Sequence, residues 1–330
     1  MNLAERRPPM RILITGATGF VGGHLVERLL REGGHELHGL ARGIKWPDSL
    51  HHLAGSIALH SVDINDGNAI VDVLRSLRPE WIFHLAGYAN TGMSFREPLK
   101  AWQSNWGGTF QLYDAIARWG GKPRTLFAST GLVYGNSAGG GQACSENDPL
   151  YPASPYASSK AAADLLSFQV TCHPGLDVVR ARCFNQFGPR QSADYATANF
   201  ARQIAAIEKG TQSPLLETGD LSGQRDLTDV RDMVSALIAI MRDGQTGEVY
   251  NAGTGMALVM RTVLDQMRSM ARVRIEVRER LDAHRKQDTS VSRADIRKLQ
   301  AATGWRPEYS LEQTLADLLH FWRRQANVAA

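Results

Sequence analysis

Residues 11–22, RILITGATGFVG, join a short apolar run to three glycines and the beginning of a helical pattern. The apolar run predicts a buried strand, and the pattern that follows predicts a helix. Gly16 permits the tight turn between them, Gly19 permits close approach to a pyrophosphate, and Gly22 permits close packing of helix on strand. This context favours a dinucleotide site over a purely structural turn. The cofactor-binding residues expected here are Gly16, Thr18, Gly19, Phe20 and Val21.

Short apolar runs alternate with helical patterns through the first half of the chain. Strands are expected at 11–15, 36–40, 57–60, 81–85, 125–129 and 177–182, and helices at 20–32, 101–119 and 158–172. This alternation predicts an α/β fold with a Rossmann-type doubly wound parallel sheet, covered on both faces. Beyond Cys183 the loops lengthen and helices are separated by single short strands, which predicts a smaller C-terminal α/β substrate lobe.

Three segments follow from these patterns. We expect a flexible N-terminal arm over 1–9 and a dinucleotide-binding Rossmann domain over 10–183. Residues 184–330 should form mainly a substrate-binding lobe, with segments that return to the Rossmann domain.

Composition narrows the class of protein. The 330 residues are 43% hydrophobic, and 37 Lys and Arg against 33 Asp and Glu give a net charge of +4. The basic clusters are short, which disfavours nucleic-acid binding and suits an anionic small molecule. Three cysteines without metal-ligand spacing predict a reducing compartment and no metal site. No long apolar run and no signal-peptide pattern are visible, so we expect a cytoplasmic protein without a membrane partner.

The type of dinucleotide is indicated after the second strand. An acidic residue usually stands there in NAD sites to hold the ribose 2′-hydroxyl, but this chain has Arg42. A guanidinium suits a 2′-phosphate, so NADP(H) is favoured. NAD(H) remains the alternative if Arg42 is a solvated surface charge. Asp63 is expected to accept a hydrogen bond from the adenine amino group. Further cofactor contacts are expected from Ile64, Leu85, Ala86 and Gly87.

Tyr156 and Lys160 are four residues apart at the start of a predicted helix, so they share one face. A free tyrosine has a pKa of about 10, and a neighbouring ammonium lowers that pKa by stabilising the phenolate. This pair is suited to proton transfer during hydride transfer, although an isolated pair at this spacing can also be solvated. Thr130 ends the fifth strand, where it is placed to orient the reacting oxygen. The alternatives are that Ser129 takes this role, or that both hydroxyls cap a turn.

These motifs together resemble the extended short-chain dehydrogenase/reductase family. The matching segments are 15–22, 84–87, 129–135 and 154–160, which occur in the family's order and spacing within residues 10–323. In that family the matched tyrosine is the acid/base, the lysine assists it, and the Ser/Thr positions the substrate. The resemblance implies catalytic roles for Thr130, Tyr156 and Lys160 in an NAD(P)-dependent oxidoreductase. Tyr156 and Lys160 would also contact the cofactor.

Within the family, further segments are most similar to enzymes that act on GDP-mannose derivatives. These segments are 94–98, 183–192, 199–210, 225–232 and 247–251. The pattern is closest to GDP-4-keto-6-deoxy-D-mannose reductases and GDP-mannose 4,6-dehydratases, and the dehydratase pattern carries a basic Glu two residues after the Thr. Here that position is Leu132, which cannot accept a proton. The resemblance therefore favours NADPH-dependent reduction of a 4-keto group to a GDP-D-rhamnose-type product. A 4-epimerase with tightly bound NAD and a dehydratase are the alternatives.

The same resemblance implies substrate and subunit contacts. Arg225, expected in a Gly-rich loop, would pair with the diphosphate, and Arg202 would lie on a helix that flanks the nucleobase. Helices 101–119 and 158–172 resemble the pair through which family members form homodimers, although their apolar stripes also fit a core. The residues implied for binding a GDP-sugar are Ser94, Thr130, Asn185, Arg202, Arg225, Arg285 and Asp288. Two departures from the reductase pattern, Asn185-Gln186 and Arg285-Lys286, bear on which sugar is bound.

Overall fold

The computed structural model describes residues 8–135, 141–280 and 291–328. Backbone contacts divide them into two compact units. The first unit contains the described residues within 1–129, 153–181 and 237–249, and the second contains those within 130–152, 182–236 and 250–330. Residues 1–7 of the predicted arm lie outside the described residues. The predicted division between residues 183 and 184 stays a prediction.

A seven-stranded parallel sheet dominates the fold, as the alternating pattern predicted. Its strands are β1 (Met10–Thr15), β2 (His35–Ala41), β3 (Ala58–Ser61), β4 (Trp81–His84), β5 (Arg124–Thr130), β6 (Val178–Cys183) and β10 (Val249–Ala252). The helices that lie between these strands along the chain include α1 (Phe20–Glu32), η1 (Asp48–Leu53), α2 (Gly67–Leu77), α3 (Thr91–Ser94), α4 (Pro98–Trp102), η2 (Gln103–Gly107), α5 (Gly108–Trp119), η3 (Gly131–Tyr134), α6 (Pro155–Cys172) and α8 (Val230–Asp243).

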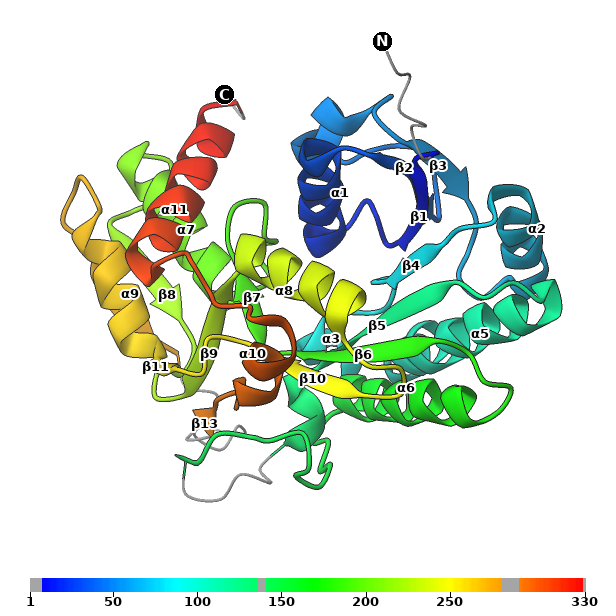
Figure 1. Cartoon of the computed structure of the whole chain (residues 1–330). Helices are drawn as coiled ribbons and strands as arrows, with labels where there is room; N and C mark the ends of the chain where they lie inside the picture. The colour runs from blue at the N-terminus through cyan, green and yellow to red at the C-terminus, as the bar shows by residue number, and fades with distance from the viewer. Residues whose placement is uncertain (1–7, 136–140, 281–290, 329–330) are drawn as a thin grey trace, which may run out of the picture. The chain divides into compact units, whose positions relative to one another are not determined.

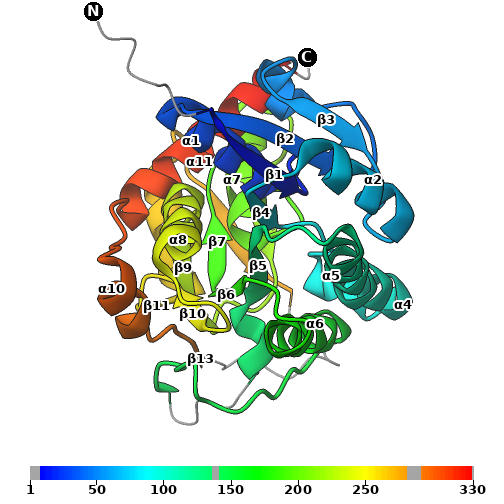
Figure 2. The ribbon, with the colours of Figure 1, turned by 45° about the vertical axis from the view of Figure 1, so that its right-hand side comes forward.

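Helices cover both faces of this sheet (Figures 1 and 2). Helices α2, α5 and α6 lie on one face, and α1 lies on the other. On the first face, strand residues such as Leu13 and Phe127 pack in one buried cluster with Leu74 of α2 and Leu112 of α5. Burial on both faces explains why the strands read as short, nearly continuous apolar runs.

The strand order places the ligand site of the first unit. The order is β10-β6-β5-β4-β1-β2-β3, so the direction of winding reverses between β1 and β4. Open α/β sheets bind ligands beyond the carboxyl ends of the strands at such a reversal. The loops at 16–19 and 85–87 follow these two strands and therefore meet at the expected site.

Three helices differ from the sequence-based expectation. The helix expected at 101–119 begins at Pro98 and contains a π-helical segment, Gln103–Gly107. The helix expected at 158–172 begins at Pro155, because the Ser154 side chain accepts a hydrogen bond from the Ala157 amide at 3.1 Å and proline suits the first turn. Helix α2 was not expected, and Asp66 caps it in the same manner.

The sequence pattern predicted single short strands between helices in the second unit. In the structure these strands pair into small sheets, which pack with helices. Strands β7 (Asn185–Phe187), β9 (Gln224–Asp229), β11 (Ala257–Val259) and β13 (Val291–Ser292) pair in one sheet, and β8 (Leu215–Thr218) pairs with β12 (Glu276–Glu279). Its further helices are α7 (Ala196–Glu208), α9 (Met260–Ser269), α10 (Arg297–Thr303) and α11 (Leu311–Val328).

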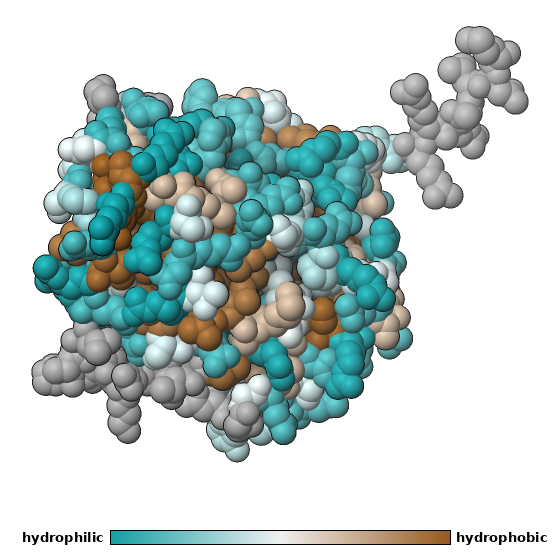
Figure 3. Space-filling view, turned by 90° about the vertical axis from the view of Figure 1, so that its left-hand side faces the viewer, coloured by the Kyte–Doolittle hydropathy of each residue, from teal (hydrophilic) through white to brown (hydrophobic). Residues whose placement is uncertain are grey.

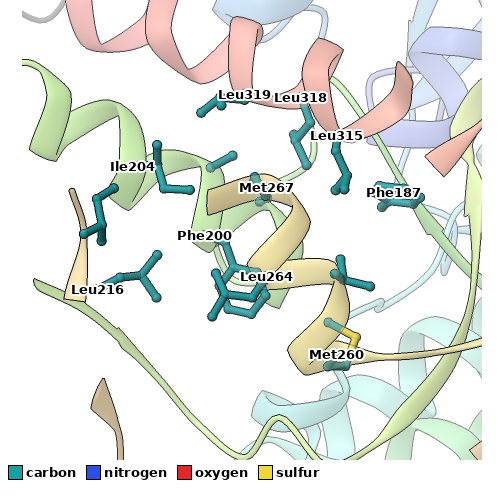
Figure 4. Packing of buried hydrophobic residues seen from close by; sticks show 14 of the residues in the cluster. Phe187, Phe200, Ile204, Leu216, Met260, Leu264, Met267, Leu315, Leu318 and Leu319 are labelled. Carbon is teal, nitrogen blue, oxygen red and sulfur yellow. The ribbon is translucent and has the colours of Figure 1, made fainter. Parts of the chain in front are cut away.

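A separate hydrophobic core holds the second unit together. Figure 3 faces the side on which α9 and α11 lie in Figure 1, and it shows hydrophobic residues interspersed with polar ones. Beneath that surface, Phe200 of α7, Leu264 of α9 and Leu318 of α11 point toward one another (Figure 4). Among the described residues, no helix is long and apolar enough to span a membrane.

Candidate active site

The glycine-rich turn after β1 has no room for side chains. Gly16 has a φ of +74°, and a Cβ there would lie 2.9 Å from the Ala86 backbone nitrogen. A Cβ on Gly22 would lie 2.1 Å from the Gly16 carbonyl oxygen. Both positions therefore require glycine, and the turn after β1 touches the loop after β4, as the strand order implies.

The beginning of α1 fits the pyrophosphate of a dinucleotide. Gly19 is the N-cap residue, and among the described residues no side chain caps this helix and no acidic residue lies in its first turn. The first N–H groups of a helix have no intrahelical acceptor, and the helix dipole adds positive potential there. Thr18, Phe20 and Val21 lie half-buried at this end, so the residues present fit the cofactor that the sequence predicts.

The residues expected around the adenosine end lie beyond β2 and β3. Arg42 is exposed directly after β2. The Oδ1 atom of Asp63 accepts hydrogen bonds from the Asn65 backbone nitrogen at 2.9 Å and from its Nδ2 atom at 3.0 Å. Ile64 is only 7% exposed and packs in the core cluster of the first unit. The cofactor contacts of these residues stay predictions.

Small residues are also required in the loop after β4. The Ala86 amide donates to Thr15 Oγ1 at 3.1 Å, and the Tyr88 amide donates to Asn105 Oδ1 at 2.8 Å. A Cβ on Gly87 would lie 2.5 Å from that same Asn105 oxygen. The loop that contains Leu85, Ala86 and Gly87 is therefore held by buried polar side chains at both of its ends.

Lys160 is buried and fixed in place rather than solvated. Its Nζ atom donates to the Ala128 carbonyl oxygen at 2.5 Å and lies 4.3 Å from the centroid of the Phe127 ring. The side chain is only 8% exposed. This excludes the solvated-pair alternative for Lys160 and places the ammonium at the carboxyl end of β5. Tyr156 is half-buried one helical turn earlier.

Thr130 and its neighbours occupy the end of β5. Thr130 Oγ1 accepts a hydrogen bond from the Leu132 amide at 3.2 Å, so this hydroxyl does cap the following turn. Accepting that bond leaves the O–H group able to donate. The Ser129 hydroxyl is buried and has no hydrogen-bond partner among the described residues. Leu132, the position that separates the reductase and dehydratase patterns, lies beside Thr130.

Ser94 lies next to the helix that carries Tyr156. Its side chain is fully buried, donates to the Thr91 carbonyl oxygen at 2.6 Å and accepts from the Tyr156 amide at 3.2 Å. Ser94 therefore anchors the first turn of the helix that carries Tyr156. Substrate contact by Ser94 stays a prediction.

The remaining substrate residues lie in the second unit. Arg225 is in strand β9, opposite Leu258 of β11, so its expected placement in a Gly-rich loop was wrong. The antiparallel pairing with β11 extends the strand to Gln224. Arg202 is exposed on α7 and donates to Asn199 Oδ1 at 2.9 Å. Asn185 begins β7. Arg285 and Asp288 lie outside the described residues.

Sequence reasoning missed a set of buried polar residues in the first unit. His84, Asn105 and Thr109 are each at most 1% exposed. They connect the end of β1, the loop after β4 and helix α6 through hydrogen bonds. The sequence signal that could have identified them is a polar residue within a segment whose other residues are predicted to be buried in the sheet or its helices.

Comparisons with known proteins identify the family to which the chain belongs. The family model described as GDP-mannose 4,6 dehydratase matches residues 13–318. The chain is 32% identical over 312 residues to a GDP-6-deoxy-D-mannose reductase from Pseudomonas aeruginosa, which covers 94% of this chain and 97% of the relative. It is 25% identical over 344 residues to the human GDP-mannose 4,6 dehydratase, covering 95% of this chain and 91% of that protein.

Solved structures are similar over nearly the whole chain. The structure of RMD from Pseudomonas aeruginosa complexed with NADPH superposes with a TM-score of 0.83 at 31% identity, covering 96% of this chain and 99% of that one. The Thermus thermophilus UDP-glucose 4-epimerase in complex with NAD gives a TM-score of 0.84 at 28% identity, covering 95% and 99%. The chain therefore belongs to the GDP-mannose 4,6 dehydratase family, within the extended short-chain dehydrogenase/reductases.

Proposed function

We propose that this enzyme uses NADPH to reduce the 4-keto group of GDP-4-keto-6-deoxy-D-mannose, giving a GDP-D-rhamnose-type product. The observation that carries the proposal is Leu132 beside Thr130, in a site that retains Tyr156 and a buried Lys160. Elimination of water needs a base at C5, and leucine cannot serve as one. Reduction needs only a hydride, a proton donor and orientation.

The chain's own residues supply the proton and the orientation. When bound, the cofactor supplies the hydride. The Tyr156 phenol donates its proton to the sugar O4 atom, and the ammonium of Lys160 stabilises the phenolate left behind. The Ala128 carbonyl holds that ammonium at one place, which limits the reorganisation needed during reaction. Thr130 orients O4 by donating a hydrogen bond.

Incubation with GDP-4-keto-6-deoxy-D-mannose and NADPH tests the proposal. We expect the NADPH absorbance to fall, with one reduced GDP-sugar formed for each NADPH consumed. The corresponding UDP-linked ketosugar is the control for the base, and its slower turnover is expected. No NADPH oxidation with the GDP-linked ketosugar would refute the reductase assignment. Conversion of GDP-mannose to a 4-keto product would instead identify a dehydratase.

A nucleotide-sugar 4-epimerase is the second candidate, supported by the similarity to the Thermus thermophilus epimerase in complex with NAD. Such an enzyme keeps NAD bound and returns the hydride to the same substrate. The two functions differ in what the purified protein carries. Denaturation should release little dinucleotide from a reductase, whereas stoichiometric NAD in the released fraction would favour the epimerase.

We propose that Arg42 makes NADPH the preferred cofactor. Within the described residues its side chain makes no ion pair, and it lies exposed after β2, where the 2′-phosphate is expected. Arg42→Ala is expected to raise the KM for NADPH about 10- to 100-fold, the worth of one charge-assisted hydrogen bond. The KM for NADH should be nearly unchanged. Arg31→Ala is the matched control, because Arg31 is exposed in the last turn of α1, at the end away from the glycine-rich turn. Equal effects on both cofactors would contradict the proposal.

The substrate contacts of Asn185, Arg202 and Arg225 are part of the same proposal. Arg225 supports it best, because its planar, permanently charged group is half-buried in β9 and suits a diphosphate.

A location in the cytoplasm is also proposed. Its support is that Cys144, Cys172 and Cys183 are free thiols.

We propose that the enzyme is a homodimer that pairs through α4, η2, α5 and α6. Large hydrophobic side chains are exposed at Leu99 (74%) and Leu165 (59%) of these neighbouring helices. Others on the same helices are Trp102, Trp106, Phe110 and Phe168. Leu99 and Trp102 are three residues apart on α4, and the rings of Trp106 and Phe110 stack with centroids 5.7 Å apart, so each pair shares one face. Exposed apolar patches of this kind mark protein interfaces.

A charge in this helical face is expected to give a monomer. In Leu165→Glu, dimerisation would bury an unpaired carboxylate, which costs several kcal/mol. Light scattering after size exclusion should show about half the mass of the unmodified protein. Val273→Glu places the same charge at a 44%-exposed hydrophobic residue of the second unit and should remain dimeric. A monomeric unmodified protein would refute the proposal.

A further inference from the structure

A continuous chain of buried hydrogen bonds runs through the first unit. It begins at Thr15, the last residue before the glycine-rich turn, whose Oγ1 atom lies 2.8 Å from His84 Nδ1. His84 Nε2 lies 2.9 Å from Thr109 Oγ1, and the Thr109 hydroxyl donates to the Asn105 carbonyl oxygen at 2.5 Å. The chain therefore reaches the π-helical segment from the end of β1.

From that segment the chain continues to the catalytic helix. Asn105 Nδ2 donates to Ser159 Oγ at 2.9 Å, and the Ser159 hydroxyl donates to the Tyr156 carbonyl oxygen at 2.8 Å. The other side-chain atom of Asn105, Oδ1, accepts from the Tyr88 amide. One carboxamide thus connects the loop after β4 with the turn that carries Tyr156. The π-helical segment is what places it there, since such segments change which face a residue occupies.

Counting protons determines the form of the imidazole. The single hydroxyl hydrogen of Thr109 is donated to Asn105, so Thr109 Oγ1 must accept from His84, and Nε2 must carry a hydrogen. Thr15 Oγ1 accepts from the Ala86 amide and has its own hydrogen to donate to Nδ1. Every hydrogen bond in this series has one donor and one acceptor when His84 is neutral and carries its hydrogen on Nε2.

We propose that His84 is a positioning residue, a permanently neutral imidazole that fixes the glycine-rich turn and the Tyr156 helix relative to each other. His84 makes no direct hydrogen bond to Tyr156 among those described. Its effect on the reaction passes through Thr109, Asn105 and Ser159 to the backbone of Tyr156. Loss of one hydrogen bond in the chain should therefore misplace the phenol without weakening substrate or cofactor binding.

The surroundings of His84 keep the imidazole neutral. Burial, the larger cause, and the positive charge of Lys160 together lower the pKa of His84 to about 3. Lys160 is the charged group that acts on the ring, and the aromatic ring of Phe127 lies 5.8 Å away. A protonated ring would place a hydrogen on Nδ1, opposite the hydrogen of Thr15. This hydrogen-bond chain therefore keeps one arrangement at neutral pH.

The kinetic test compares two changes of Thr109. Thr109→Val keeps the shape but removes the hydroxyl, and we expect kcat to fall about 10- to 100-fold with KM and the NADPH Kd within about twofold. Thr109→Ser keeps the hydroxyl and should restore kcat to within about threefold. An unchanged kcat in Thr109→Val, or a folded Thr109→Ser that does not recover, would overturn the proposal.

A matched control separates positioning from stability. Thr314 is also 1% exposed, and its hydroxyl donates to Asp229 Oδ2 at 2.7 Å in the second unit. Both Thr314→Val and Thr109→Val should lower the thermal midpoint, but Thr314→Val should leave kcat within about twofold. Equal losses of kcat in both variants would show a stability effect only and would also overturn the proposal.

A second measurement needs no substrate and so does not depend on the proposed reaction. In ¹⁵N-histidine spectra of the unmodified protein, His84 is identified by the signals that move in Thr109→Ser. We expect a protonated Nε2 and an unprotonated Nδ1, unchanged between about pH 5 and about pH 8. A hydrogen on Nδ1, or titration in this range, would refute the neutral imidazole. If His84 behaves as expected and no ketosugar is reduced, only the proposed substrate fails.

Discussion

Replacement of Tyr156 by phenylalanine is expected to lower kcat by about 10²- to 10⁴-fold, because the substrate oxygen loses its proton donor. The ring and its packing are retained, and the helix should not move, since Ser94 and Ser159 hold only the backbone of Tyr156. NADPH affinity should change little. The measurement is steady-state reduction of the ketosugar together with NADPH titration by fluorescence.

Tyr113 provides the matched control for this change. Its hydroxyl is buried between α5 and α6 and lies 2.7 Å from Ser167 Oγ. Tyr113→Phe should cost about 1 kcal/mol of stability, the net worth of one buried hydrogen bond, and leave kcat unchanged. If Tyr156→Phe kept full turnover, the proton would come from another group and the proposed mechanism would be wrong.

Replacement of Gly22 by alanine is expected to lower NADPH affinity at least about 100-fold. The new Cβ would lie 2.1 Å from the Gly16 carbonyl oxygen and 2.9 Å from the Ala17 Cα atom. Both contacts are with backbone, so the turn itself must open. Two charge-assisted hydrogen bonds to phosphate would account for a loss of this size. NADPH titration and thermal unfolding measure the effect.

Gly23 is the control for the helix itself. Both residues lie in α1, so alanine brings each the same gain in helix propensity. The three atoms nearest to a Cβ on Gly23 all belong to the Leu50 side chain, the closest at 2.6 Å, and a side chain can move. Gly23→Ala should therefore keep NADPH affinity within a few-fold. Tight binding by Gly22→Ala would show that the turn tolerates opening and that the cofactor does not depend on its geometry.

The features that the sequence predicted correctly depend on local order. The glycine-rich turn follows from three glycines between a strand and a helix, and Gly16 and Gly22 indeed have no room for a Cβ. The parallel sheet follows from the alternation of apolar runs and helical patterns. Tyr156 and Lys160 lie on one helix because of their spacing. The turn and the Tyr156–Lys160 pair needed only neighbours within a few residues, where backbone geometry determines which groups meet.

Tertiary structure decided what those residues contact. Lys160 is buried against the Ala128 carbonyl because α6 packs on the sheet, and nothing in its own segment indicates this. Ser94 anchors the Tyr156 turn from 62 residues away. Arg225 became a strand residue through pairing with β11 on one side and β13 on the other. Hydrogen bonds and burial between distant segments depend on how the whole chain folds, so the local pattern does not contain them.

The same distinction between local sequence and tertiary contact applies to the residues of the site. The sequence by itself determined the glycine-rich turn, the spacing of Tyr156 and Lys160 and the absence of a carboxylate at Leu132, because these are properties of residue identity and spacing. Only the tertiary structure decided that His84 is a neutral link between Thr15 and Thr109, because its form depends on which donors and acceptors face its ring.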